Sequence, residues 1–136
     1  MSEISKQLTH AYQQQAERYH QIRELVQRQK QIMDDSPAPG CVLDMCRQVE
    51  ELMAEITVIE RAIEPAKRIW TERPVDPDGE LDAVLKSIED VIQEIARTQA
   101  QVQQKLMEFV QQERDRSDAA RASMMANRAR TLYKAG

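Results

Sequence analysis

The sequence predicts an all-α protein: an elongated antiparallel three-helix bundle with a long, partly detached C-terminal helix. Apolar residues recur at alternating spacings of three and four through three long segments, the pattern of helices that each bury one face. Prolines and glycines, which break helices, gather between these segments in residues 34–40 and 73–79. An aromatic content of 4% with 31% charged residues also favours an elongated helical protein over a compact globule with a pocket.

The first predicted helix covers residues 3–33. Two glutamines weaken its apolar stripe, but the spacing is helical throughout. Residues 34–40 (DDSPAPG) then contain two prolines and a glycine, so we expect a loop there. The stripe consists of Ile4, Leu8, Ala11, Gln15, Tyr19, Ile22, Val26, Gln29 and Met33.

The second predicted helix covers residues 41–72 and has the most regular stripe of the three. Pro65 lies inside it and removes one backbone hydrogen bond, but the stripe stays in phase across it. We therefore expect a kink and not a stop. The stripe consists of Val42, Met45, Val49, Leu52, Ile56, Ile59, Ile63, Ala66 and Trp70.

The third predicted helix begins after Pro74, with Asp76 as N-cap and Pro77 at the first helical position. Its coiled-coil-like stripe runs as far as about residue 110. It comprises Leu81, Leu85, Ile88, Ile92, Ile95, Gln99, Val102, Leu106 and Phe109. The predicted common core includes Ile22, Val49, Leu52, Ile56, Ile59, Ile88, Ile92 and Ile95.

Beyond Phe109 the stripe is lost, although neither proline nor glycine interrupts the chain before Gly136. Residues 111–121 are nearly all polar and predict a hinge or a solvated series of turns. A second apolar stripe, which we call the C-terminal stripe, then appears out of phase with the first. It consists of Ala122, Met125, Ala129 and Leu132.

We therefore expect one helical domain over residues 1–136, with a bundle core at about 3–110 and a mobile amphipathic C-terminal helix at about 111–134. The C-terminal stripe and Tyr133 are the predicted partner-binding surface, together with Arg121, Arg128 and Arg130. Two interpretations of these cations stay open. They complement the negative end of the helix dipole, or they belong to a basic amphipathic helix that docks on an acidic partner or a membrane surface.

The formal net charge of −4 and pI near 5.3 argue against general nucleic-acid binding, which needs an excess of Lys and Arg. The sequence also lacks the roughly 20 consecutive apolar residues of a membrane span, and its start does not resemble a signal peptide. The expected location is the cytoplasm. Cys41 and Cys46 are predicted to be small buried hydrophobes, because their spacing suits neither a disulfide nor a redox pair.

Chemistry-bearing motifs are few. Glu17 and His20 form a Glu-x-x-His pair, but a di-metal helical bundle needs two such pairs and two further glutamates. The sequence also lacks a nucleophile elbow and a glycine-rich phosphate loop. We therefore predict no catalytic residues, no metal, no cofactor and no enzymatic activity.

The helix pattern, closing on Leu132-Tyr133-Lys134-Ala135-Gly136, resembles that of flagellar type III export chaperones of the FlgN type. The resemblance implies a cytosolic chaperone whose C-terminal half holds the amphipathic terminal helix of a hook-filament junction subunit and prevents premature assembly. Tyr133 would correspond to the tyrosine that the family uses to dock on the cytoplasmic domain of the export gate. The alternative is a non-enzymatic coiled-coil scaffold that associates with itself, and homo-oligomerisation stays open in both cases.

Overall fold

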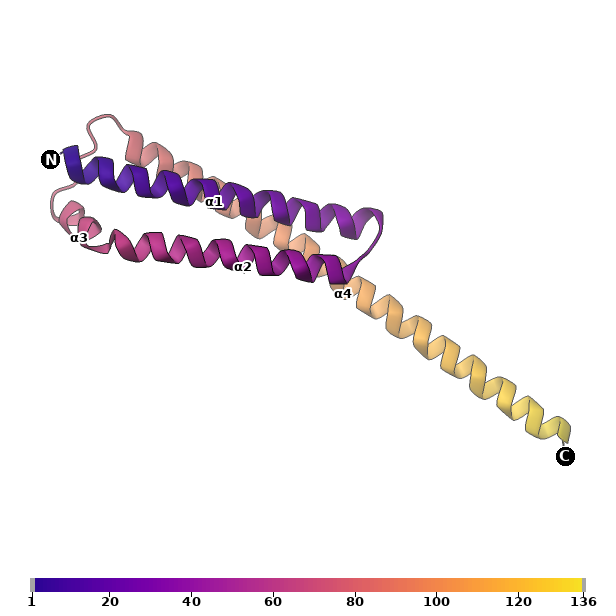
Figure 1. The fold of residues 1–136 in the computed structure, drawn as a ribbon. Helices are drawn as coiled ribbons and strands as arrows, with labels where there is room; N and C mark the ends of the chain where they lie inside the picture. Colours follow the sequence, from indigo (N-terminus) through magenta and orange to yellow (C-terminus); the bar gives the residue numbers. More distant parts are fainter. Residues whose placement is uncertain (1, 136) are drawn as a thin grey trace. The chain divides into compact units, whose positions relative to one another are not determined.

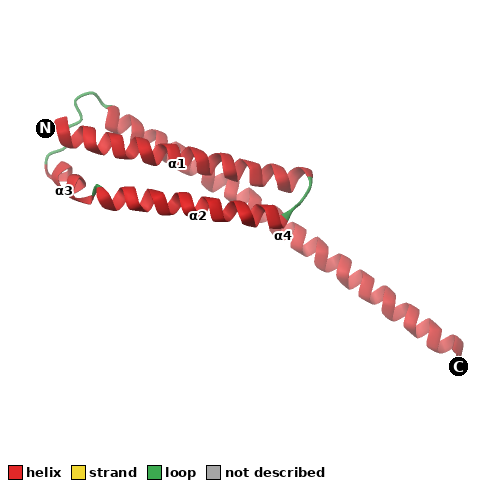
Figure 2. Ribbon diagram, in the orientation of Figure 1, coloured by secondary structure: helices red, strands yellow, loops and turns green. Residues whose placement is uncertain are grey.

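The computed structural model describes the backbone of residues 2–135 and the side chains of residues 3–133. Within this range it contains four helices and no strand, which confirms the all-α class (Figure 2). The helices are α1 (Ser2–Asp35), α2 (Pro39–Ala62), α3 (Glu64–Glu72) and α4 (Glu80–Ala135). The chain divides into two compact units, one ending at Val102 and one starting at Gln103.

In the first unit α1 and α2 lie side by side and run in opposite directions (Figure 1). The loop between them is shorter than predicted. Only residues 36–38 are outside helices, because α1 continues to Asp35 and α2 begins at Pro39. Proline suits the first turn of a helix, where its missing N–H has no partner to lose.

The second predicted helix is two helices in the structure. α2 ends at Ala62 and α3 begins at Glu64, with Ile63 between them at φ −96° and ψ 2°. The prediction of a single kinked helix is therefore wrong in this detail. Pro65 explains the break, since it cannot donate the hydrogen bond that would continue α2. The interruption is short, because the Lys67 N–H again donates to the Ile63 carbonyl at 2.9 Å.

The Asp76 side chain caps α4, but Asp76 is not the N-cap residue as predicted, because the Gly79 carbonyl accepts the first helical hydrogen bond, from the Ala83 N–H at 3.0 Å. Its two carboxylate oxygens accept hydrogen bonds from the N–H groups of Leu81 at 3.3 Å and Asp82 at 3.1 Å. The prediction that Pro77 is the first helical residue is wrong, because α4 begins only at Glu80. Asp78 and Gly79 lie between Pro77 and the start of α4. Gly79 has a φ of 69°, a left-handed conformation that costs glycine little and other residues more.

Two core clusters hold the first unit together. Each takes side chains from α1, from the segment that contains α2 and α3, and from α4. In both clusters, aliphatic groups are removed from water, which contributes about 1.5 to 3 kcal/mol for each large side chain. The first core cluster contains Leu8, Ala11, Ile63, Ala66 and Leu81, and the second contains Ile22, Val26, Ile56, Val91 and Ile95.

Between Leu81 and Val102 the predicted stripe of α4 is correct at every second position and wrong at the positions between, whereas Leu106 and Phe109 are half-buried. Leu81, Ile88, Ile95 and Val102 are buried as predicted. However, Val91 is buried where Ile92 was expected, and Ile92 is 41% exposed. Leu85 is likewise 37% exposed. Since Val91 and Ile92 are both apolar, the sequence allows either choice, and the structure buries Val91.

Polar residues in the first unit are also buried. Gln15 donates from Nε2 to Glu60 Oε2 at 2.7 Å, and Gln29 donates from Nε2 to the Val42 carbonyl at 2.9 Å. These bonds satisfy the two polar side chains that weaken the apolar stripe of α1. The predicted burial of the cysteines, in contrast, is wrong. Cys41 and Cys46 are both exposed, because they lie outside the face of α2 that carries Val42 and Ile56.

Glu60 joins this polar network to α3. Its Oε1 lies 2.5 Å from Lys67 Nζ and accepts a hydrogen bond from the Tyr12 hydroxyl at 3.4 Å. Burial alone would raise the pKa of Glu60, but the hydrogen bonds from Lys67 and Gln15 and the charge of Lys67 outweigh it and lower that pKa. Burial and then the Glu60 charge raise the pKa of Tyr12.

Candidate protein-binding surfaces

The predicted binding residues all lie on the C-terminal part of α4, in the second unit. They are exposed: Met125 to 66%, Leu132 to 70% and Tyr133 to 90%. The C-terminal stripe has spacings of three, four and three, so its members share one helix face. The helix therefore presents an apolar surface that no other described side chain of the second unit covers.

Basic residues border the C-terminal stripe. Arg121 and Arg128 line a hollow of about 180 Å³ on the helix surface with Met124 and Met125. Among the side chains that the structure describes, no ion pair involves Arg121, Arg128 or Arg130. Their charges are thus available to an acidic partner.

Met124 was missed by the sequence prediction. It is 70% exposed and lies in the same hollow, three residues after Arg121 and four before Arg128. The signal was the Met-Met pair itself, because Met124 next to Met125 widens the apolar face. Methionine is flexible and suits surfaces that adapt to a partner.

The polar run 111–121 is helical in the structure, so the prediction of a series of turns is wrong. Side-chain contacts one turn apart accompany the helix there. Gln111 donates to Asp115 at 2.9 Å, and Arg116 pairs with Glu113 at 3.2 Å. All eleven side chains are exposed, and such surface pairs each contribute only a few tenths of a kcal/mol.

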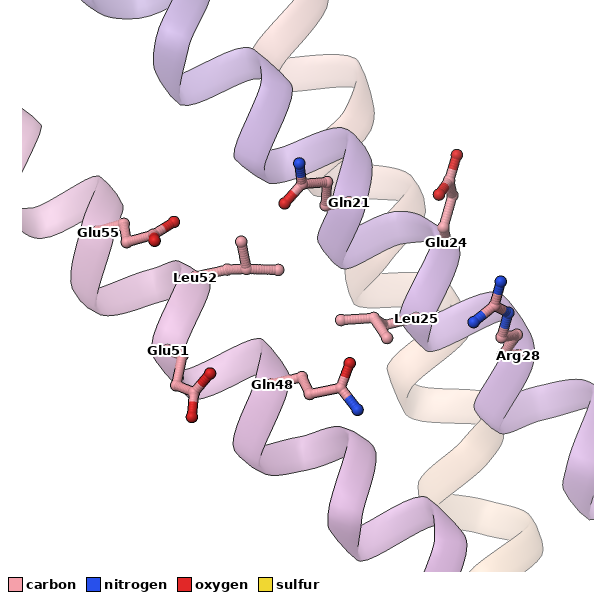
Figure 3. A pocket seen from close by; sticks show the side chains of 8 residues that line it. All are labelled: Gln21, Glu24, Leu25, Arg28, Gln48, Glu51, Leu52 and Glu55. Atoms are coloured by element: carbon pink, nitrogen blue, oxygen red, sulfur yellow. The ribbon is translucent and has the colours of Figure 1, made fainter.

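Two hollows on the first unit differ in chemistry. The one between α1 and α2 has a volume of about 310 Å³. In Figure 3, Leu25 and Leu52 point toward each other there, and charged side chains such as Glu24, Arg28 and Glu55 surround them. Because the apolar surface of these two leucines is small and closely bordered by charges, this hollow does not suit an apolar ligand.

The second hollow, which we call the apolar groove, has a volume of about 280 Å³ and was not predicted from the sequence. Most of its side chains are apolar, and they come from α1, α2 and α4. The sequence assigned several of them to the core. The lining residues are Tyr19, Ile22, Val49, Met53, Ile92, Ile95 and Gln99.

The Glu17 and His20 pair shows no sign of a metal site. The Glu17 side chain is 74% exposed and lies 3.7 Å from Arg18 Nη1. Within the described part of the chain, no three His, Cys, Asp or Glu side chains are grouped to hold a metal ion. Likewise, none of the helices described has a stretch both long and apolar enough to span a membrane.

Comparison of the chain with models of known protein families, with curated proteins and with solved structures gave no significant match.

Proposed function

We propose that this chain is a cytosolic protein-binding protein without enzymatic activity, a flagellar type III export chaperone of the FlgN type. In this proposal its scaffold is an elongated antiparallel three-helix bundle, and its C-terminal helix binds the amphipathic terminal helix of a hook-filament junction subunit. The observation that carries the proposal is the exposed apolar face of α4, where Met124, Met125 and Leu132 are each at least 66% exposed.

The chemistry of this face suits a helical partner. Ala122 and Ala129 are small and allow another helix to approach closely, while the methionines adapt to its side chains. If the client helix becomes ordered as it binds, the entropic cost of that ordering offsets part of the contact free energy and keeps the complex reversible. Arg121 and Arg128 would steer an acidic client toward the stripe and set its register.

A double variant tests this proposal. Met125→Glu with Leu132→Glu places two carboxylates on the C-terminal stripe and should abolish client binding, measured by co-purification from the native cell with mass identification of the partner. In dilute solution, helicity and melting should remain close to those of the wild type, because both core clusters lie before Val102. Ser123→Glu is the matched control, since this exposed residue lies on another face of the same helix.

The outcomes separate the two classes of function. A flagellar subunit that is lost only with the stripe variant supports the chaperone. Recovery of this chain alone would favour the self-associating scaffold, and client binding retained by the double variant would move the client site elsewhere. Within the chaperone proposal, Tyr133→Ala should spare the client complex and weaken docking to the cytoplasmic domain of the export gate.

A further inference from the structure

The apolar groove has the properties of a binding site for one more helix. Its two rims are apolar and open: Met53 on α2 is 43% exposed and Ile92 on α4 is 41% exposed. Between them Val49 and Ile95 form part of the lining. An amphipathic helix laid in such a groove buries its residues at spacings of three, four and seven.

The exposed flank of α4 extends the groove along the helix. Leu85, Ile92 and Gln99 are seven residues apart and so lie on one face, and all three are exposed. At Val91 and Ile92 this flank exists because α4 has two adjacent apolar positions and buries only the earlier one, and one heptad before it Leu85 is also exposed. Two apolar positions one heptad apart, Leu85 and Ile92, are thus left open to an external helix, and Gln99 continues the same face as a polar residue.

Acidic residues border this surface. Glu50 lies three residues before Met53, and Glu89 lies three residues before Ile92, and both are exposed. The first unit as a whole has nineteen Asp and Glu against twelve Lys and Arg, a formal charge of −7. The occupant that fits best is therefore a basic amphipathic helix.

This chain itself carries such a helix. From Gln103 onward it has seven Lys and Arg against four Asp and Glu, a formal charge of +3, and no acidic residue follows Asp118. The C-terminal stripe supplies the apolar residues at spacings of three, four and three. Acidic groove and basic helix are thus complementary in both charge and hydrophobicity.

We propose that the apolar groove binds the C-terminal helix of a second copy of this chain. A second copy is favoured over the chain's own helix because α4 forms one wall of the groove and no proline or glycine lies between Gly79 and Gly136 to reverse its direction. If each copy supplies one groove and one helix, the pair closes as a symmetric dimer with two equivalent contacts. This inference does not rest on the export function.

Sedimentation equilibrium of the full chain tests the site. The wild type should form dimers in a concentration-dependent manner, and the association should weaken as salt rises, because opposite charges contribute to it. Met53→Glu, in the groove, and Leu132→Glu, on the C-terminal stripe, should each raise the dissociation constant by at least about tenfold. Val58→Glu is the control, because Val58 is 66% exposed on another face of α2.

Mixing the two variants makes the test specific. The Met53→Glu copy retains an intact C-terminal helix, and the Leu132→Glu copy retains an intact groove, so the mixture should regain one of the two contacts. We expect mixed dimers to form at concentrations at which each variant alone is monomeric. Circular dichroism of each variant checks that the fold is intact.

Three results would overturn the proposal. A full chain that stays monomeric at about 100 µM would exclude a useful affinity. Dimers that are lost in Leu132→Glu but unchanged in Met53→Glu would show the C-terminal helices pairing with each other. A monomer in which Leu132→Glu increases amide exchange around Met53 and Ile92 would place the helix in the groove of its own chain. Client capture has a separate readout, so either proposal can fail alone.

Discussion

Ile56 and Ile92 show how the same residue type has different consequences at two positions of one apolar pattern. Ile56 is 5% exposed and belongs to the second core cluster, whereas Ile92 is 41% exposed at the rim of the apolar groove. The sequence places both in the core. The structure separates them, because Ile56 is almost fully buried whereas Ile92 is only partly buried.

The corresponding substitutions should therefore differ. Ile56→Ala should lower the free energy of unfolding by about 2 to 4 kcal/mol, since it removes buried methyl groups and leaves a cavity. Ile92→Ala should cost less, about 1 kcal/mol, because the side chain is only partly buried and its truncation leaves no enclosed cavity. Urea denaturation of both variants gives the comparison, and equal losses would mean that Ile92 is buried in solution.

At individual residues, sequence reasoning identified most apolar burial but not polar satisfaction. Gln15 and Gln29 are only 4% exposed, and each has a hydrogen-bond acceptor on α2. No periodicity can reveal this, because the acceptors lie 45 and 13 residues away in the chain. The exposed cysteines have the same explanation: which face of a helix is buried depends on its neighbours.

At the scale of elements, α4 owes its start to a side chain that precedes it by four residues. Asp76 satisfies two of the N–H groups that have no partner in the first turn. Its negative charge also lies near the positive end of the helix dipole. Gly79 allows the chain to turn between the cap and the helix, with its φ of 69°.

Asp76→Ala should lower the free energy of unfolding by about 1 kcal/mol, through the loss of this cap. Asp78→Ala is the matched control, because Asp78 lies in the same turn and no hydrogen bond of its carboxylate is described. Thermal melts of both variants supply the measurement. A control as damaging as Asp76→Ala would show that charge in this turn, and not the cap, supports the helix.

The elements were predictable where one residue decides the outcome, and less so where two are equivalent. The breaks near Pro37 and Pro74 and the cap at Asp76 follow from local chemistry. The choice between Val91 and Ile92 does not, since both are apolar and the packing of α1 and α2 decides it. The apolar groove is a direct result of that choice and was for this reason missed.

At the scale of the whole chain, the buried core residues and the residues proposed for partner binding are different. Both core clusters lie before Val102, whereas the residues from 119 onward are exposed wherever their side chains are described. The out-of-phase stripe in the sequence predicts a separate surface here, and its side chains are exposed in the structure. The sequence cannot show whether another segment or another molecule covers it. The core and this exposed C-terminal surface can therefore be separated by truncation.

A chain truncated after Asp118 should unfold in dilute solution with a free energy within about 0.5 kcal/mol of the wild type, because it loses only exposed side chains. At high protein concentration the two should diverge. Docking of a C-terminal helix into the groove of a second copy stabilises the folded wild type by mass action, and the truncated chain has no helix to dock. Thermal melts over a hundredfold range of concentration measure this difference. The expected result is a melting temperature that rises with concentration in the wild type alone. Parallel curves for the two chains would show that the C-terminal helix adds nothing to self-association. A large loss of stability for the truncated chain even in dilute solution would place part of the core beyond Asp118.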